Sequence, residues 1–223
     1  MNKLHIGLAI VLPILILAII TPWSVDIDFW ASNYYFKNGE FWSNRFMDWL
    51  YYYALVPAWI VSIGGLIVWG LSFYQPKLRP YRIVGVYLAL TLAIGSGIFV
   101  HAIFKEQWGR PRPKEAIEFG GEQPYRPYYS ANFFDRIKKY KSFSCGHCTM
   151  GFYLFSVMWL GVYYKRRWIF WTGLGLALGL GFLLSWLRIA QGGHFFTDAL
   201  VSAIVMWLTA LILYLFLLER KSE

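Results

Sequence analysis

The sequence predicts an all-α, polytopic membrane protein whose six transmembrane helices form a bundle. Three observations predict this class. Hydrophobic residues make up 58% of the 223 residues and charged residues only 15%, whereas soluble domains carry about 25% charged residues. Six apolar stretches reach the roughly 20 residues that a helix needs to cross a bilayer. Each stretch is separated from the next by a charged or Pro/Gly-containing break.

The six stretches cover residues 4–23, 50–74, 82–104, 146–164, 168–187 and 199–217. The first stretch resembles a secretory signal, but it is long, and "IITPWSV" lacks the small-x-small pattern of a cleavage site. We therefore expect it to stay as a helix. No internal repeat or linker divides the sequence, so a single domain over residues 1–223 is expected. Within "GLGLALGLG", Gly175 and Gly179 are expected to be contacts between packed helices.

The distribution of basic residues predicts which side of the membrane each segment faces. Six spans place both termini on one side, together with the short basic segments "QPKLRPYR" and "KRR". Such segments are typical of cytoplasmic loops. Segments 24–49, 105–145 and 188–198 then face the opposite side. Segment 105–145 is more basic than any of the proposed cytoplasmic loops, so a simple charge count would invert this topology.

The basic charge of segment 105–145 has another explanation, which is an anionic ligand. The net charge of +9 then reflects both the topology and an acidic substrate. Nucleic acid is a weaker explanation, because the sequence contains no soluble nucleic-acid-binding module. Five of the basic residues in the segment are expected to be ordinary solvated side chains: Arg110, Lys114, Lys138, Lys139 and Lys141.

Segment 24–53 is unusually aromatic. Trp and Tyr favour the headgroup region of a bilayer, where the ring meets lipid and its polar edge meets water. Short interfacial helices are expected around Phe29–Phe36 and Phe41–Trp49, with Gly39 between them. These helices would anchor the protein or form a wall for a lipid substrate.

Three polar clusters lie at predicted outer helix ends, where ionisable groups usually mark function. The first is "HAIFKEQWGRPRP", with Lys105 and Arg112. The second is "SCGH", residues 144–147. The third is "LRIAQGGHFFTD", with Arg188, His194 and Asp198. The predicted topology places all three on the same face of the membrane, so they can converge.

The residue types in these clusters suit phosphoryl transfer. If Ser144 caps the fourth helix, the N–H groups of Cys145, Gly146 and His147 are free to bind an anion. The side chains of Lys105, Arg112 and Arg188 can add donors for phosphate oxygens.

The histidines and the aspartate complete this chemistry. His194 and Asp198 are four residues apart and share a helix face. A carboxylate on one imidazole nitrogen makes the other a better nucleophile. His147 can give a proton to a leaving oxygen. The set needs no metal and no cofactor.

The pattern Lys-x6-Arg-Pro, then Ser-Gly-His, then Arg-x5-His-x3-Asp resembles the type 2 phosphatidic acid phosphatase (PAP2) superfamily. The resemblance covers nearly the whole sequence. It implies that His194 attacks phosphorus to form a phosphohistidine, that Asp198 orients His194, and that His147 protonates the leaving alkoxide. Lys105, Arg112 and Arg188 would hold the phosphate, together with the stretch Ser144, Cys145 and Gly146.

Two positions depart from the family pattern. The second block usually begins Pro-Ser, where this sequence has Ser144 and Cys145, and the Ser before the third-block Arg is Leu187 here. The first change leaves the backbone N–H groups of the second block in place, so they can still bind phosphate. The second change removes a hydroxyl that would donate to phosphate.

The resemblance also implies a substrate and a location. Membrane members of the superfamily act mostly on lipid phosphates, so the expected partners are an anionic lipid phosphate and the bilayer. The overall plan is most similar to the bacterial lipid A 1-phosphatases. We therefore expect a site facing the periplasm from the inner membrane, with cytoplasmic termini. Phosphatidylglycerol phosphate and undecaprenyl pyrophosphate are alternative substrates.

Two alternatives come from other classes of protein. Cys145 and Cys148 form a Cys-x-x-Cys pair at a helix start, which is typical of thiol oxidoreductases. However, the sequence has only these two cysteines, and membrane oxidoreductases generally relay electrons through a second pair. The other alternative is a lipid-anion binder or transporter without catalysis.

Overall fold

The computed structural model describes residues 2–132 and 140–219, and almost all regular structure in them is helical. The all-α class predicted from the sequence is confirmed. The α-helices are α1 (Lys3–Ile20), α2 (Ser24–Tyr35), α3 (Arg45–Tyr53), α4 (Val56–Leu71), α5 (Arg82–Leu92), α6 (Gly146–Phe152), α7 (Phe155–Tyr163), α8 (Arg167–Ala190) and α9 (Phe196–Leu217). A π-helical segment, η3 (Ala93–Lys105), continues α5, and a small hairpin joins β1 (Phe36–Lys37) to β2 (Glu40–Phe41). Short 3-10 turns cover Thr21–Trp23, Pro76–Tyr81, Pro113–Glu115 and Ile117–Phe119.

Five helical stretches in the described residues are long and apolar enough to cross a membrane. They are Lys3–Tyr35, Arg45–Leu71, Pro76–Gln107, Arg167–Ala190 and Phe196–Leu217. The predicted stretch 146–164 is instead divided into α6 and α7 by a turn at Tyr153 and Leu154. The chain is a multi-pass membrane protein, and the count of six spans stays a prediction.

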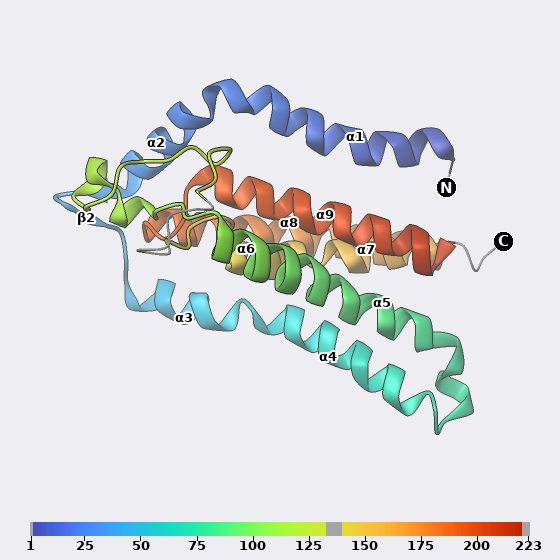
Figure 1. Cartoon of the computed structure of the whole chain (residues 1–223). Coiled ribbons are helices and arrows are strands. Elements are labelled where there is room, and N and C mark those ends of the chain that lie inside the picture. Colours follow the sequence, from blue (N-terminus) through green and yellow to red (C-terminus); the bar gives the residue numbers. More distant parts are fainter. Residues whose placement is uncertain (1, 133–139, 220–223) are drawn as a thin grey trace.

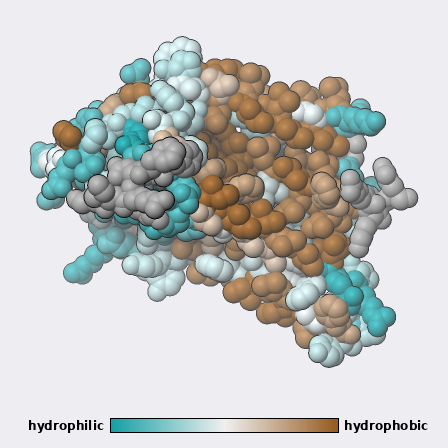
Figure 2. Space-filling model, viewed as in Figure 1, coloured by the Kyte–Doolittle hydropathy of each residue, from teal (hydrophilic) through white to brown (hydrophobic). Residues whose placement is uncertain are grey.

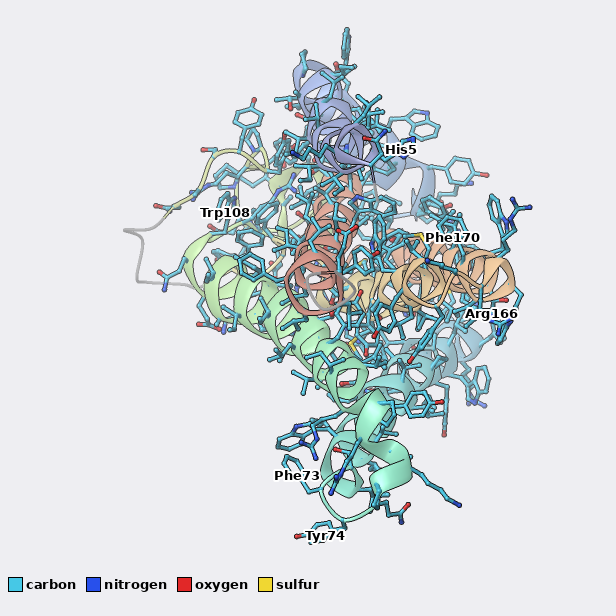
Figure 3. All side chains as sticks on the ribbon, turned by 90° about the vertical axis from the view of Figure 1, so that its right-hand side faces the viewer. His5, Phe73, Tyr74, Trp108, Arg166 and Phe170 are labelled. Carbon is cyan, nitrogen blue, oxygen red and sulfur yellow. A yellow bond between two sulfur atoms is a disulfide. The ribbon has the colours of Figure 1, made fainter. Side chains whose placement is uncertain are left out.

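The helices run side by side, with two distinct ends (Figure 1). The start of α1, the turn between α4 and α5, and the end of α9 lie at one end. The hairpin, α2, α3 and the segment before α6 lie at the other. A broad apolar surface covers the helices, whereas polar residues gather at the hairpin end (Figure 2). Seen from the end that carries the termini, His5 of α1 and Phe73 and Tyr74 of the α4–α5 turn lie on opposite sides of the bundle (Figure 3).

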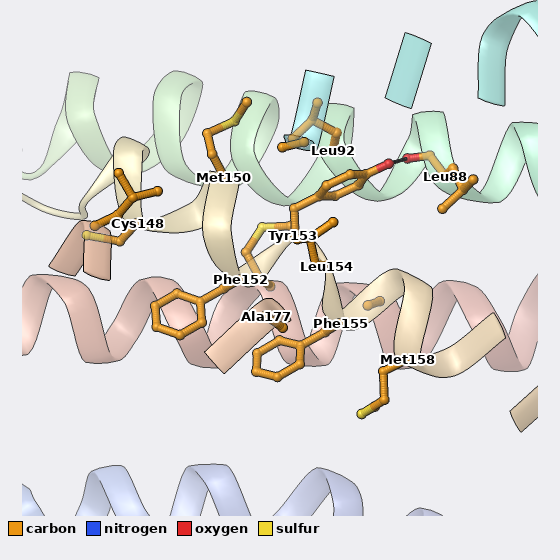
Figure 4. Close-up of a cluster of buried hydrophobic side chains, with 14 of the residues drawn as sticks. Leu88, Leu92, Cys148, Met150, Phe152, Tyr153, Leu154, Phe155, Met158 and Ala177 are labelled. Atoms are coloured by element: carbon orange, nitrogen blue, oxygen red, sulfur yellow. Dashed lines mark hydrogen bonds between the residues drawn. The ribbon is translucent and has the colours of Figure 1, made fainter. Parts of the chain in front are cut away.

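The broken segment α6–α7 lies in the core of the bundle. Phe152, Tyr153, Phe155 and Met158 are all buried there, together with side chains of α5 and α8 (Figure 4). The Tyr153 hydroxyl donates to the carbonyl oxygen of Leu88 at 3.0 Å. This bond satisfies a polar group that would be costly to bury alone.

Small residues let α8 approach α6 and α7, but they are not the predicted ones. A Cβ added at Gly175 or Gly179 would meet no atom within 4 Å, so that prediction is wrong. The contacts come from Gly173 and Gly181, with the buried Ala177 midway between them. Gly173, Ala177 and Gly181 are four residues apart along α8, so they share one face of the helix. Gly175 and Gly179 are offset from them by two residues and therefore lie on the opposite face.

Candidate active site

His194 and Asp198 meet at the start of α9. The carboxylate atom Oδ2 of Asp198 lies 3.5 Å from Nδ1 of His194, and both side chains are buried. This gap is longer than a hydrogen bond, and Nδ1 makes no hydrogen bond in the described part of the chain. Because Nδ1 faces the carboxylate, Nε2 is the nitrogen left for chemistry. The predicted pairing of the two residues is therefore present.

The first turn of α9 holds Asp198 in place. Its Oδ2 accepts the backbone N–H of Phe195 at 3.0 Å and the hydroxyl of Ser142 at 2.6 Å. A carboxylate in the first turn of a helix is favoured by the free N–H groups and the dipole there. Ser142 was not singled out in the sequence, although it lies only two residues before Ser144.

The loop between α8 and α9 brings Arg188 beside His194. The backbone oxygen of Arg188 accepts the N–H groups of Gly193, at 2.9 Å, and His194, at 3.2 Å. Gly192 has a φ of 60°, which allows this tight reversal. A Cβ at Gly193 would run into the guanidinium of Arg188. Glycine at 193 therefore lets the Arg188 side chain lie against the backbone next to His194.

The start of α6 differs from the prediction by one residue. The cap is Cys145, whose Sγ accepts the N–H of Cys148 at 3.2 Å, and not Ser144. The N–H of Cys145 is not free, because it donates to the backbone oxygen of Asp198 at 3.4 Å. The first helical residues are Gly146 and His147, and their N–H groups form the exposed end of the helix dipole.

Lys105 lies directly over this helix start. A Cβ added at Gly146 would be 3.2 Å from Nζ of Lys105 and 2.8 Å from Nε2 of His101. Only glycine lets these two side chains approach the backbone so closely. Lys105 is the last residue of η3, so the end of this helix and the start of α6 meet at one point.

Among the buried side-chain polar atoms without a hydrogen-bond partner in residues 2–132 and 140–219, three are donors of residues predicted to bind phosphate: Nε of Arg112, Nε of Arg188 and Oγ of Ser144. Each comes from a different predicted motif block. Buried polar atoms in native proteins are almost always hydrogen-bonded. An oxyanion held between the three blocks would satisfy them, which is what the sequence predicts for a phosphate.

Two of the predicted phosphate-binding cations, Arg188 and Lys105, act electrostatically on His194. Burial lowers the pKa of His194 to about 4, the Asp198 carboxylate opposes this shift, and the charges of Arg188 and Lys105 add to it. His147 also interacts electrostatically with Arg188, His194 and Lys105. The imidazole of His194 is therefore neutral at pH 7, as a nucleophile must be.

Arg110 is a further residue of the site, and its predicted solvation is wrong. Its side chain is fully buried and bonds to Oδ1 of Asp198 at 2.5 Å and to Oδ2 of Asp28 at 2.6 Å. Burial disfavours the charge, but the carboxylates of Asp198 and Asp28 raise the pKa of Arg110 above its usual value. The guanidinium also lies 4.5 Å from the ring centroid of Phe195.

Two of the other basic residues that were expected to be solvated, Lys114 and Lys141, lie in the described part of the segment. Lys141 pairs with Glu106 and remains partly exposed, as expected of a solvated side chain. Lys114 is exposed at a turn. Arg136, Lys138 and Lys139 lie outside the described residues.

Helix α3 contributes an aromatic side chain that the sequence did not indicate. The ring of Tyr51 stacks on the imidazole of His147, with centroids 4.0 Å apart. The guanidinium of Arg188 lies 4.9 Å from the same ring. Arg188 also donates to the side chain of Gln191 at 2.8 Å, and Gln191 donates to Asp48 of α3 at 3.3 Å. Helix α3, which overlaps the predicted interfacial helix Phe41–Trp49 and extends beyond it to Tyr53, therefore forms a wall of the candidate site.

Cys145 and Cys148 form a disulfide that brackets Gly146 and His147, and both are fully buried. The described residues contain no group of three or more His, Cys, Asp or Glu side chains that could hold a metal ion. The donors that converge here are cations and N–H groups. Such a set suits an anion rather than a cation.

Comparisons with known proteins agree with this geometry. A family model described as the PAP2 superfamily matches residues 85–222. The chain is 31% identical over 229 residues to a protein of Francisella tularensis subsp. novicida (strain U112) named lipid A 4'-phosphatase, with all of both chains covered. A Rhizobium leguminosarum protein of the same name is 26% identical over 133 residues, which cover 60% of this chain and 53% of that protein. No solved structure matches the chain.

The bundle and its site define a membrane lipid phosphatase. The chain belongs to the PAP2 superfamily, and the family predicted from its three motif blocks is confirmed. The two relatives are named for the 4'-phosphate of lipid A, whereas the overall plan of the sequence led us to expect the 1-phosphate.

Proposed function

We propose that this protein removes a phosphate from lipid A at the periplasmic face of the bacterial inner membrane, through a phosphohistidine at His194. The observation that carries the proposal is the set of unpartnered buried donors from Arg112, Ser144 and Arg188 beside the His194–Asp198 pair. These donors and the start of α6 can surround a phosphate, and the pair can attack it.

The reaction has two balanced steps. In the first, Nε2 of His194 attacks phosphorus, the bond from phosphorus to the lipid oxygen breaks, and His147 gives its proton to that oxygen. In the second, water attacks phosphorus, the P–N bond breaks, and the water proton goes to His147. Asp198 stabilises the positive charge on His194 in the intermediate. Lys105, Arg112 and Arg188 stabilise the charge on the phosphoryl oxygens.

The 4'-phosphate is the position that we propose. This position is supported by the Francisella relative named lipid A 4'-phosphatase, which matches this chain over its full length. The match includes the outer segments around the site as well as the motif blocks. Helix α3 is one of these segments, and it supplies Tyr51 and Asp48 next to the catalytic side chains. Outer segments such as α3 lie where a lipid headgroup would bind. They can therefore determine whether the 1-phosphate or the 4'-phosphate of lipid A enters the site.

The Cys145–Cys148 disulfide supports the periplasmic location. Disulfides persist in oxidising compartments such as the periplasm and are rare in the cytoplasm. The basic turn between α4 and α5 lies at the end of the bundle opposite to the hairpin (Figure 1), as the positive-inside rule favours for a cytoplasmic segment. The disulfide also argues against a thiol oxidoreductase, because exchange needs access to a sulfur and both are buried.

Phosphate release from purified lipids tests the substrate. The purified protein should release phosphate from lipid A, and mass spectrometry of the product should show loss of the 4'-phosphate with the 1-phosphate retained. Phosphatidylglycerol phosphate and undecaprenyl pyrophosphate serve as competing substrates. Loss of the 1-phosphate instead would contradict the position, and no release from any lipid would contradict catalysis and favour a lipid-anion binder.

Thiol labelling tests the location. A cysteine placed at the exposed Lys114, in a background without Cys145 and Cys148, should react with an impermeant reagent added outside intact spheroplasts. A cysteine at Lys77, in the opposite turn, is the matched control and should react only after permeabilisation. The reverse pattern would place the site on the cytoplasmic side.

A further inference from the structure

A buried chain of charged side chains joins helix α2 to the carboxylate that faces His194. Arg110 lies at its centre. One amino group of its guanidinium bonds to Oδ1 of Asp198 at 2.5 Å, and the other bonds to Oδ2 of Asp28 at 2.6 Å. All three side chains are fully buried. Asp28 lies outside the residues matched by the family model, which begin at 85.

Each member of this chain is held by further bonds. Nε of Arg110 donates to the backbone oxygen of Arg126 at 2.8 Å, and Nη1 donates to the hydroxyl of Thr197 at 2.9 Å. Asp28 accepts the backbone N–H of Thr197 at 2.9 Å and the hydroxyl of Tyr125 at 2.9 Å. A buried ion pair with all its polar atoms bonded has one geometry, because any shift leaves a charge unpaired.

The two carboxylate oxygens of Asp198 have separate partners. Oδ1 faces Arg110, whereas Oδ2 faces His194, Ser142 and the N–H of Phe195. The bond to Arg110 thus fixes the rotation of the carboxylate and keeps Oδ2 toward Nδ1 of His194. Without Arg110, Asp28 and Asp198 would be two buried like charges, and one would have to take a proton or turn away.

We propose that Arg110 and Asp28 are positioning residues for the reaction: Arg110 orients the Asp198 carboxylate toward His194, and Asp28 holds Arg110. The N-terminal helix α2 is by this means part of the catalytic apparatus. The inference rests on the proposed role of His194. It adds two residues that touch neither substrate nor nucleophile and that act through Asp198.

The test compares Arg110→Gln, Arg110→Lys and Asp28→Asn with the wild-type protein on lipid A. Arg110→Gln should lower kcat roughly 10- to 100-fold, the range found for residues that orient the ligands of a metal site. KM should stay within about threefold, since no phosphate contact is lost. Arg110→Lys keeps the charge and should recover part of kcat. Asp28→Asn should lie between wild type and Arg110→Gln.

A matched control separates positioning from loss of stability. Tyr87 is buried in the middle of the bundle, and its hydroxyl bonds to the backbone oxygens of Ser156 and Ala210. Tyr87→Phe should lower the unfolding temperature and leave kcat unchanged. If Arg110→Gln does not fold, Arg110→Lys and Asp28→Asn test the inference in its place. A lower kcat with an unchanged KM in these variants supports the positioning role.

Two results would overturn the inference. One is wild-type kcat in the folded variants. The other is a rise in KM with kcat unchanged, which would make Arg110 a substrate-binding residue. Neither result touches the proposed function, which is tested separately by phosphate release from the wild-type protein and by the loss of activity in His194→Ala.

Discussion

The ring of Tyr51 lies between two residues of the phosphatase motifs, with its centroid 4.0 Å from that of His147 and 4.9 Å from the guanidinium of Arg188. It comes from α3, far from both in sequence. The aromatic segment before α4 therefore does more than contact lipid. In the proposed mechanism, it orients His147, the proton donor, and Arg188, a phosphate ligand.

The first prediction concerns this ring. Tyr51→Leu should lower kcat about tenfold, because stacking and cation–π contacts of this kind contribute about 1–2 kcal/mol. Tyr51→Phe keeps the ring and is the matched control. Steady-state kinetics on lipid A checks both variants. Equal loss in Tyr51→Phe would show that the hydroxyl matters instead of the stacked face.

The motif residues could be predicted from the sequence because their spacing carries the chemistry. Lys105 ends η3, His147 lies in the first turn of α6, and Arg188 and Asp198 lie in the last turn of α8 and the first turn of α9, which are the helix ends that were predicted to meet. Arg110 was missed because a basic residue in a basic loop predicts solvation, and nothing local shows its two carboxylates. Asp28 gave a usable signal, since a carboxylate within an aromatic helix at the membrane is costly unless it is paired.

Helix register was harder to predict than helix existence. Gly175 and Gly179 fit a small-xxx-small pattern as well as Gly173 and Gly181 do. Only the packing of α6 and α7 against α8 decides which face is buried. The division of the segment 146–164 at Tyr153 also has no signal in its composition, which is continuously apolar.

The second prediction concerns pH and stability. Burial lowers the pKa of His194 to about 4, from a usual value of 6.5. Between these values the unfolded chain holds a proton that the folded protein does not. The stability from this side chain is therefore complete above pH 6.5 and is lost as the pH falls toward 4, by up to about 3 kcal/mol.

Thermal unfolding in detergent checks this prediction. Over the interval from about pH 6.5 to 4, His194→Asn should lose less stability than the wild-type protein, because its side chain does not titrate. Other groups are common to both proteins, so the difference isolates His194. Identical pH dependence would show that His194 is not buried in its neutral form.

The third prediction concerns metal removal. The proposed mechanism stabilises the phosphoryl group with Lys105, Arg112, Arg188 and the start of α6, so activity should survive EDTA. Vanadate should inhibit, because it adopts the pentacoordinate geometry of phosphoryl transfer. Activity that is lost with the chelator and restored by a divalent ion would refute this mechanism.

The fourth prediction concerns the disulfide. In the proposed site, Gly146 and His147 offer backbone N–H groups to the phosphate, and this contact does not require sulfur. Phosphate release by the double variant Cys145→Ser, Cys148→Ala should remain within about tenfold of wild type. The chain-entropy relation for a four-residue loop predicts a loss of about 2 kcal/mol in the free energy of unfolding. A folded but inactive double variant would favour thiol chemistry.

The fifth prediction concerns the nucleophile, the central claim of the mechanism. Quenching of wild-type protein with alkaline SDS during turnover of ³²P-labelled lipid A, followed by peptide mapping at alkaline pH, should show a base-stable, acid-labile phosphate on His194. His194→Ala should carry no label and release no phosphate, whereas Asp198→Asn should label slowly. Label on another residue, or turnover by His194→Ala, would contradict the account.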